Sequence, residues 1–482
     1  MKTRIRRLQF AVLTISLLGA AGLCQPAQAA GADAATLGRI RDAGMKSDWA
    51  YQHLAEMTDS VGPRLSGSPG YDAAVQLLAA HMRALGAEVT LQPVKVPHWV
   101  RGLETAELTS YPGQPRGLIQ KLHLTALGGS GATPAAGITA RVVAVKDMAE
   151  LTARAREVPG SIVVFTARFD QNMADNGLAD VAYGQNGWYR RSGPSEAAKL
   201  GAVATLIRSV GGADFRLPHT GSTRFADDQK HSPSAALAAE DADMIARLAA
   251  RGPVSLKLVL TPQILPDHDT FNVIADWKGR DKPDEIVLVS GHLDSWDLGT
   301  GAIDDGIGVY GSAGVIAVLK DLNLRARRTI RVVGYANEEN GGAGGRAYLQ
   351  AAGGAAAAAT HAAVIESDSG AGRPLGFEAA VTTGSASQLE PLVDVLLPLG
   401  ATAITRVDQR VGADIGPLQG VGIPGFGMKP DTRHYFDLHH TPADTFDKVD
   451  PVDMQAHVAS LGVLAYFLAE MDTPLPRFTP SP

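Results

Sequence analysis

The sequence predicts an α/β protein with a mostly parallel central sheet sandwiched by helices and a second domain inserted into it. Beyond residue 271, short apolar runs at 286–289, 330–335 and 362–365 alternate with helical patterns, which is typical of a parallel sheet covered by helices. The chain has 482 residues, more than one hydrophobic core usually holds. We therefore expect two structural units.

The first 29 residues are typical of a signal peptide. Four basic residues precede an apolar run at 10–23, and Ala27-Gln28-Ala29 has the small-x-small pattern of a cleavage site. The alternative is an uncleaved membrane anchor, although the run is shorter than the ~20 apolar residues that span a bilayer. We expect an exported protein, periplasmic or secreted. No second long apolar segment stands out, so no membrane contact is expected after signal removal.

Residues 30–125 are expected to form the first part of the main domain. Val75, Leu78, Met82 and Leu85 have helical spacing over 72–85, and Gly86 is a plausible C-terminal stop. The segment 87–96 alternates like a strand.

Residues 126–265 are expected to form the inserted domain, because strand signals at 161–167 and 202–207 stand there without any tight cluster of metal-ligand residue types. Residues 266–482 then complete the main domain, and a last helical pattern covers 454–471.

Charge and cysteine content exclude several classes of protein. The net charge is −6, whereas a nucleic-acid-binding protein normally has a basic face. Removal of residues 1–29 takes away four basic residues and no acid, which leaves −10. The single cysteine rules out a disulfide framework and a cysteine-ligated metal site within one chain.

Polar residues follow three of the predicted strands, and in α/β sheets ligands bind at the carboxyl ends of strands. The sequences are Ser-Gly-His-Leu-Asp at 290–294, Asn-Glu-Glu at 337–339 and Glu-Ser-Asp-Ser-Gly at 366–370. Asp-Asp-Gly follows at 304–306, and His-His-Thr-Pro-Ala-Asp-Thr stands at 439–445. Imidazoles and carboxylates without thiolates suit zinc.

Each segment alone has an ordinary explanation. A His-x-Asp or a Glu-Glu pair is commonly a solvated surface feature, and Asp-Asp-Gly is commonly a turn. The placement of all five at strand ends or in the loops between them favours a common site. The remaining histidines lack that support, and nine of them are expected to be packing or surface residues: His53, His81, His98, His123, His219, His231, His268, His361 and His457.

The five segments, with the Gly-Pro-Arg-Leu-Ser-Gly loop at 62–67, resemble the co-catalytic dizinc exopeptidases, the family of bacterial leucyl aminopeptidases and glutamate carboxypeptidases. The resemblance covers nearly the whole mature chain. It implies a zinc-exopeptidase type of fold, and it is weaker across 126–265, where a protease-associated-like domain is implied.

The resemblance also implies a role for each motif residue and two zinc ions per chain. His292 and Asp368 would bind one zinc, Glu339 and His440 the other, and Asp304 would bridge both. Glu338 would be the general base. Asp294 would accept a hydrogen bond from His292 and fix its tautomer. His440 is preferred to His439 because it stands four residues before Asp444, and a cis peptide is implied after Asp304.

The implied activity is hydrolysis of short peptides or dipeptides through a metal-bridged water, with a zinc aminopeptidase as the alternative. A glutaminyl cyclase and a non-catalytic receptor-like binding module are further alternatives. A homodimer is implied at the family level only. Four arginines are candidates for a substrate carboxylate by sequence position, and none is assigned to the site: Arg346, Arg373, Arg410 and Arg433.

Overall fold

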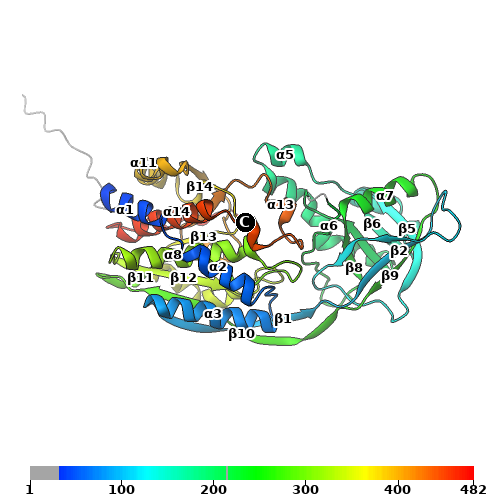
Figure 1. Cartoon of the computed structure of the whole chain (residues 1–482), viewed down its shortest axis with the longest axis horizontal. Coiled ribbons are helices and arrows are strands. Elements are labelled where there is room, and N and C mark those ends of the chain that lie inside the picture. Colours follow the sequence, from blue (N-terminus) through cyan, green and yellow to red (C-terminus); the bar gives the residue numbers. More distant parts are fainter. Residues whose placement is uncertain (1–31, 213–214, 482) are drawn as a thin grey trace, which may run out of the picture.

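The computed structural model describes residues 32–212 and 215–481. The predicted signal peptide, 1–29, lies outside the described residues. The described chain forms two lobes that lie end to end, each built around a sheet of eight strands (Figure 1).

The sheet of the larger lobe has the strand order β1-β10-β12-β11-β13-β16-β14-β15. Its middle strands, β12, β11, β13 and β16, pair in parallel as predicted, and antiparallel pairs join on both sides. The bounds are β1 Glu88–Val100, β10 Gln263–Trp277, β11 Lys282–His292, β12 Arg328–Tyr335, β13 His361–Glu366, β14 Pro374–Ala380, β15 Ala403–Val407 and β16 Gly425–Pro430.

Helices cover both faces of this sheet. Along β11, Val287 and Val289 belong to one apolar cluster and Ile286 and Leu288 to another, because successive strand residues face opposite sides. The first cluster contains residues of α1 Ala34–Gly44, α2 Trp49–Ser60, α3 Pro69–Leu85, α8 Ile307–Asp321, α11 Pro391–Leu396 and α14 Pro451–Glu470. The second contains residues of α9 Ala343–Ala351, α10 Ala357–Thr360 and α12 Gly416–Gln419.

Two core helices are apolar and long enough to cross a membrane by length and composition, Ala302–Asp321 and Pro451–Glu470. Neither was expected from the sequence to be a long apolar segment, although a helical pattern was predicted over 454–471. Both are buried inside the protein, as expected of helices that are apolar on all sides and pack in a core. Asp450 begins the second helix by accepting hydrogen bonds from the backbone of Val452 and Asp453.

The sheet of the smaller lobe has the strand order β3-β2-β9-β5-β6-β7-β8-β4. Its bounds are β2 Glu104–Ser110, β3 Gln120–Leu122, β4 Leu124–Ala126, β5 Ile138–Val145, β6 Ile162–Phe165, β7 Ala204–Arg208, β8 Ser234–Leu237 and β9 Ser255–Leu260. Its helices are α4 Met148–Ala153, α5 Gln171–Asp175, α6 Ala179–Lys199 and α7 Ala239–Ala249.

The second sheet therefore begins before residue 126, the predicted start of the inserted domain. β2 pairs with β9, so that Glu104 lies opposite Leu260, and a pairing between such distant segments leaves no local signal in the sequence. We infer that the inserted unit runs from β2 to β9.

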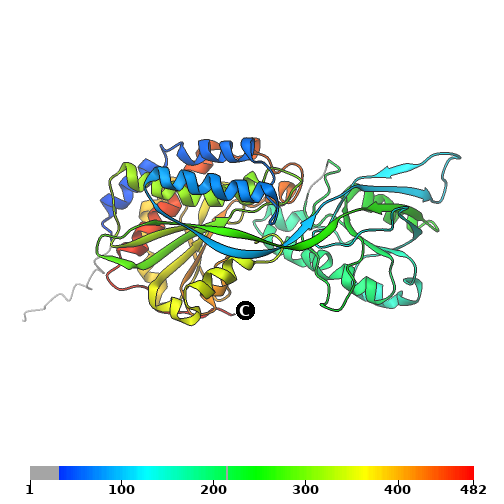
Figure 2. The same cartoon turned by 90° about the horizontal axis from the view of Figure 1, so that it is seen from below.

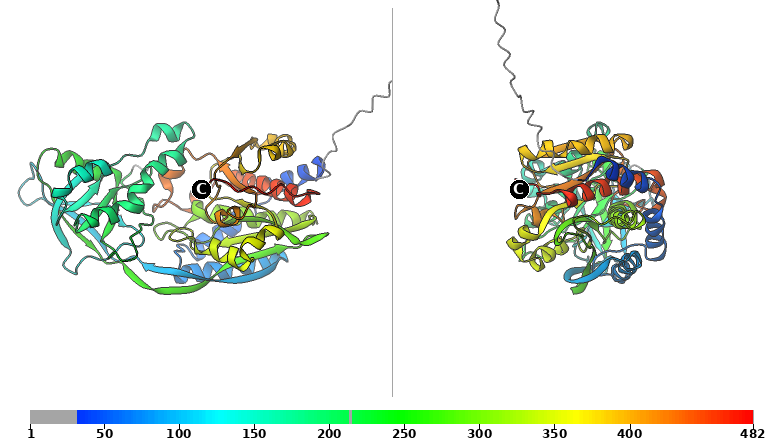
Figure 3. Two further views of the ribbon diagram at one scale, coloured as in Figure 1. Left: turned by 180° about the vertical axis from the view of Figure 1, so that it is seen from behind. Right: turned by 90° about the vertical axis from the view of Figure 1, so that its left-hand side faces the viewer.

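Two long strands connect the lobes. β1 and β10 pair antiparallel from Glu88–Asp276 to Val100–Gln263, and they run together out of the larger sheet towards the smaller lobe (Figure 2). Seen from behind, the helices of the smaller lobe lie next to the segment that contains α13, Tyr435–Leu438 (Figure 3), and α6 contacts this helix. The loop around Thr220 also lies against this segment, because Thr220 donates its backbone N–H to the carbonyl of His440 (2.9 Å).

Candidate metal centre between the two lobes

Three parallel strands bring their polar ends to one edge of the larger sheet. Ser290 lies opposite Val333 of β12 on one side and opposite Glu366 of β13 on the other. His292 therefore ends its strand beside the segments that carry Glu339 and Asp368. This is the convergence that the sequence predicts for carboxyl ends of parallel strands.

Asp304 lies at the middle of the site, in the segment Ala302–Gly306 before α8, and the peptide bond to Asp305 is cis. Its Oδ1 is 3.1 Å from Nε2 of His292, which lies 3.6 Å from Oδ1 of Asp368. Its Oδ2 is 3.1 Å from Nε2 of His440, which lies 2.9 Å from Oε2 of Glu339. The structure thus forms two groups of three ligand-type side chains that share Asp304.

The donor set fits two metal ions. Asp304 Oδ2 is buried and has no hydrogen-bond partner among the described residues, although two imidazole nitrogens lie 3.1 Å away. A buried carboxylate oxygen without a proton donor is costly unless a cation meets it. Nitrogen and oxygen donors of this kind are suitable ligands for zinc.

The charges of the site perturb its pKa values strongly. Burial raises the pKa of Glu339, with Asp304 adding to the effect and His440 opposing it, to about 7. Burial and the nearby Asp368 and Glu339 raise the pKa of Glu338 well above its usual value. Burial opposes ionisation of Asp304, but the surrounding imidazoles hold its pKa well below the usual value. A nearby positive charge would therefore stabilise the ionised forms of these buried carboxylates.

His439 and His440 both approach Asp304, and their rings stack at a centroid distance of 3.5 Å. Only His440 also reaches Glu339, whereas Nδ1 of His439 faces His219 of the smaller lobe (3.3 Å). His219, which was expected to be a packing or surface residue, is buried and belongs to a group of three histidines. Its long separation in sequence from 439–440 explains why no motif indicated it.

Asp294 holds the site in a different way from the predicted one. Nδ1 of His292 bonds to the backbone carbonyl of Asp294 (2.9 Å), while the nearer carboxylate oxygen is 3.8 Å away. The buried carboxylate instead accepts hydrogen bonds from the backbone N–H groups of Glu338 and Glu339 and from the hydroxyl of Ser66. The carbonyl fixes the tautomer of His292 as a carboxylate would, because a carbonyl can only accept and Nδ1 must therefore carry the proton. The carboxylate of Asp294 is left to hold the backbone of Glu338 and Glu339.

The loop at 62–67 packs against the same region and holds its backbone through hydrogen bonds. Arg64 is fully buried and donates to the backbone carbonyls of Leu293, Thr300 and Gly301 at 2.6–2.9 Å. These residues lie just after His292 and just before Asp304. Arg64 therefore ties together the two chain segments that carry His292 and Asp304.

A cavity of about 260 Å³ opens onto the site between the lobes. Glu338, Glu339, Asp304, Asp368 and His440 line it from the larger lobe. The smaller lobe contributes residues that the sequence analysis did not single out: Asp180, Tyr183, Arg190, Arg191, Ser222 and Arg224. None of the four arginines considered from the sequence lines this cavity.

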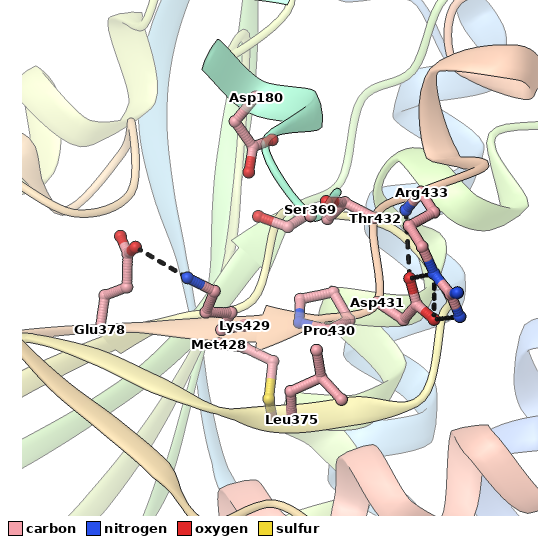
Figure 4. A pocket seen from close by; sticks show the side chains of 11 residues that line it. Asp180, Ser369, Leu375, Glu378, Met428, Lys429, Pro430, Asp431, Thr432 and Arg433 are labelled. Atoms are coloured by element: carbon pink, nitrogen blue, oxygen red, sulfur yellow. Dashed lines mark hydrogen bonds and ion pairs between the residues drawn. The ribbon is translucent and has the colours of Figure 1, made fainter. Parts of the chain in front are cut away.

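A neighbouring pocket of about 270 Å³ shares Asp180 with the cavity. It contains Ser369, which follows Asp368, and the ion pairs Lys429–Glu378 (3.6 Å) and Arg433–Asp431 (Figure 4). The guanidinium of Arg433 is thus already paired with the carboxylate of Asp431. Asp180 makes no hydrogen bond or ion pair through its carboxylate with any side chain in the described part of the chain, and it lies where the two spaces meet.

Residues 272–464 match the family model described as peptidase family M28. The chain is 37% identical to human "Carboxypeptidase Q" over 436 residues, which is 90% of this chain and 88% of that protein. The crystal structure of a "Peptidase M28 precursor" from Shewanella amazonensis SB2B is similar with a TM-score of 0.87 and 35% identity, covering 93% of this chain and 99% of that one. A zinc aminopeptidase from Bacillus subtilis has a similar fold, with a TM-score of 0.63 at 19% identity over 89% of this chain and 97% of that one.

Proposed function

Because this chain belongs to peptidase family M28 and is a zinc metallopeptidase of the exopeptidase kind, we propose that it holds two zinc ions and hydrolyses short peptides, in particular dipeptides with free ends. In this proposal His292 and Asp368 bind one ion, Glu339 and His440 bind the other, and Asp304 binds both. The observation that supports it best is the orientation of Asp304, whose two carboxylate oxygens face different imidazoles.

Bound zinc supplies polarisation of the scissile carbonyl and a more acidic water. The proton transfers belong to Glu338, which lines the cavity and forms no side-chain hydrogen bond with the described residues. It accepts a proton from the attacking water and delivers it to the leaving amine. Burial and neighbouring carboxylates raise its pKa, which makes it a stronger base.

The substrate preference that we propose comes from one face of α6 in the smaller lobe. Asp180 and Arg191 are eleven residues apart, about three helical turns, so the two side chains leave the helix within about 20° of each other. Both line the cavity. The guanidinium of Arg191 leans back over Gly187, where an added Cβ would lie 3.6 Å from its Nη2.

This arrangement suits a short zwitterion. The guanidinium lies near the level of Gly187, about 10 Å along the helix axis from Asp180. An extended dipeptide spans about 7 Å, and one hydrogen bond of about 2.9 Å at each end brings the total to about 13 Å, about 3 Å longer than this axial separation. A third residue would add about 3.3 Å. We assign the free amine to Asp180 and the free carboxylate to Arg191.

Arg224 reinforces the basic end. Its backbone N–H donates to the carbonyl of Arg191 (2.8 Å), so both side chains start from the same rim of the cavity. Neither guanidinium has an ion-pair partner within residues 32–212 and 215–481. Two unpaired arginines beside a carboxylate-rich centre favour a substrate that carries its own negative charge.

The test compares one dipeptide in three forms: free, N-acetylated and C-amidated. Arg191→Met should raise KM for the free dipeptide about 10-fold, less than a buried charged hydrogen bond is worth because Arg191 is exposed. The amide should be unaffected by the change. Arg433→Met, which removes an arginine already paired with Asp431, is the matched control and should behave like the wild type.

Three outcomes would favour other activities. If the amide is cleaved as fast as the free dipeptide and only acetylation blocks the reaction, the enzyme is an aminopeptidase that reads the amine through Asp180. If an N-terminal glutamine peptide is cyclised and not hydrolysed, and one zinc is bound per chain, the protein is a glutaminyl cyclase. Two bound zinc ions without any hydrolysis would favour a binding module.

We also propose that the protein is exported, on the strength of the signal-peptide pattern in residues 1–29. The mass of the mature N-terminus recovered from the periplasm or medium tests this, and a retained N-terminus would contradict it. Dimerisation stays a prediction, which sedimentation velocity of the mature chain checks.

A further inference from the structure

A further group of ligand-type side chains lies in the larger lobe, between α2 and α3. His53 and Glu56 stand three residues apart on α2, so they share one face of the helix. His81 approaches them from α3. One ligand atom from each of the three lies within 4.8 Å of the other two.

The two imidazoles are held in orientations that suit metal binding. Nδ1 of His53 lies 2.7 Å from the backbone carbonyl of Trp49. A carbonyl only accepts, so this nitrogen carries the proton and Nε2 keeps its lone pair. Nδ1 of His81 lies 3.1 Å from the hydroxyl of Tyr310, which leaves Nε2 to face the group. Such outer hydrogen bonds typically orient metal-binding histidines.

The spacing is close to that of a zinc site. Nε2 of His81 is 3.3 Å from Oε2 of Glu56. Ligand atoms about 2.0–2.1 Å from a tetrahedral ion are themselves about 3.3 Å apart. The rings of His53 and His81 meet at 84° with centroids 4.4 Å apart, so His53 presents its ligand atom to the same group, within 4.8 Å of the other two.

We propose that His53, Glu56 and His81 form a third zinc site, separate from the two proposed at the catalytic centre. Two imidazoles and one carboxylate are donors suited to zinc and unsuited to calcium or magnesium. The side chain of Glu56 is 52% exposed, so water completes the coordination from the open side. Burial and the nearby His53 lower the pKa of His81, which keeps its imidazole neutral and available.

The place of this ion in the fold assigns it a structural task. It joins α2 to α3, and α2 in turn packs against the segment of Asp304, where Leu54 would lie 2.6 Å from a Cβ added to Gly306. Clamping α2 therefore stiffens the support behind the shared catalytic ligand without contacting substrate.

The experiment measures zinc per chain by equilibrium dialysis and elemental analysis of the mature protein after chelator treatment. The wild type should bind one more zinc than Glu56→Gln, and His53→Gln should show the same loss. His81 is buried, so these two partly exposed positions decide the matter if His81→Gln does not fold. The matched control is His268→Gln, because His268 pairs with Asp72 (2.9 Å) and belongs to none of the groups of three ligand-type side chains among the described residues, and it should retain the full number.

The same comparison in an Asp304→Ala background keeps this proposal separate from the catalytic one. There Glu56→Gln should still remove one zinc, whatever the remaining occupancy of the catalytic centre. Equal zinc content in the wild type, Glu56→Gln and His53→Gln would overturn the proposal.

Discussion

Glu338 and Glu339 are adjacent residues of the same type, and the structure predicts opposite results when each is replaced by glutamine. The carboxylate of Glu338 makes no hydrogen bond or ion pair with the described residues, although its pKa is raised by burial and nearby charges. Glu339 accepts a hydrogen bond from the backbone of Trp296 (3.2 Å) and meets His440 (2.9 Å). This difference in contacts is the basis for the proposal that Glu338 transfers protons and Glu339 binds zinc.

The expected size of each effect follows from these contacts. Glu338→Gln preserves shape and breaks no hydrogen bond, so folding stability should change by less than about 0.5 kcal/mol and zinc content should not change. Loss of the base should lower kcat by about 10²–10⁴-fold, which corresponds to about 3–5 kcal/mol. Glu339→Gln removes a proposed ligand and should weaken zinc binding by at least about 100-fold, the upper range for loss of an outer partner.

The assay combines kcat for a free dipeptide at saturating substrate with zinc content for both variants. Glu378→Gln serves as the control, because Glu378 is a partly exposed carboxylate in the neighbouring pocket and should change neither quantity. A Glu338→Gln enzyme that retains near wild-type kcat, with contaminating wild type excluded, would refute the assignment of the base. Full zinc content in Glu339→Gln would refute the division between base and ligand.

Three further predictions concern stability. Arg64→Met leaves backbone carbonyls around the site without their donor, so the free energy of unfolding should fall by about 3–5 kcal/mol in urea titrations; a loss below about 1 kcal/mol would contradict the role given to this arginine. Gly308→Ala places a Cβ 1.9 Å from the carbonyl oxygen of Ser367, so the backbone must shift, with a cost of about 1–3 kcal/mol and reduced zinc content; unchanged zinc affinity would count against it. Burial lowers the pKa of both His361 and His457 to about 4, below the unfolded value of about 6.5. The unfolded chain therefore binds more protons between these values, and stability should fall as pH drops from about 6.5 to about 4, by up to about 3 kcal/mol for each histidine; His457→Gln should flatten this dependence in pH-dependent unfolding, and an unchanged slope would refute the argument.

The strand-end residues of the site could be predicted from the sequence. His292, Glu339 and Asp368 each follow an apolar run directly, and the parallel pairing of β11 with β12 and β13 carries such residues to one edge. The helix Pro69–Leu85 was also predictable, because apolar spacing and Gly86 mark its course and its end. These are local signals, and local backbone geometry turns them into structure.

Contacts between segments far apart in the chain could not be predicted in the same way. The spacing before Asp444 favours His440 over His439, but the contact with Glu339, which only His440 makes, joins segments far apart in the chain and has no local signal. The partner of His292 was expected to be the carboxylate of Asp294 and is its carbonyl, because the carboxylate is occupied by the backbone of Glu338 and Glu339. Sequence spacing indicates that His292 and Asp294 lie close together. Which oxygen of Asp294 accepts from His292 depends on the other hydrogen-bond donors nearby.

The amino-acid order alone indicates the parallel core and the residue types of the candidate metal centre, because each rests on patterns within a few residues, whereas the exopeptidase chemistry was implied by the resemblance of the motifs to a known family. The residues that the smaller lobe contributes to the cavity depend on the path of the whole chain. Asp180, Arg191 and Arg224 reach the site only because β1 and β10 hold the smaller lobe against the segment of His440. Pairing over such distances is governed by packing and loop closure, which no short motif records.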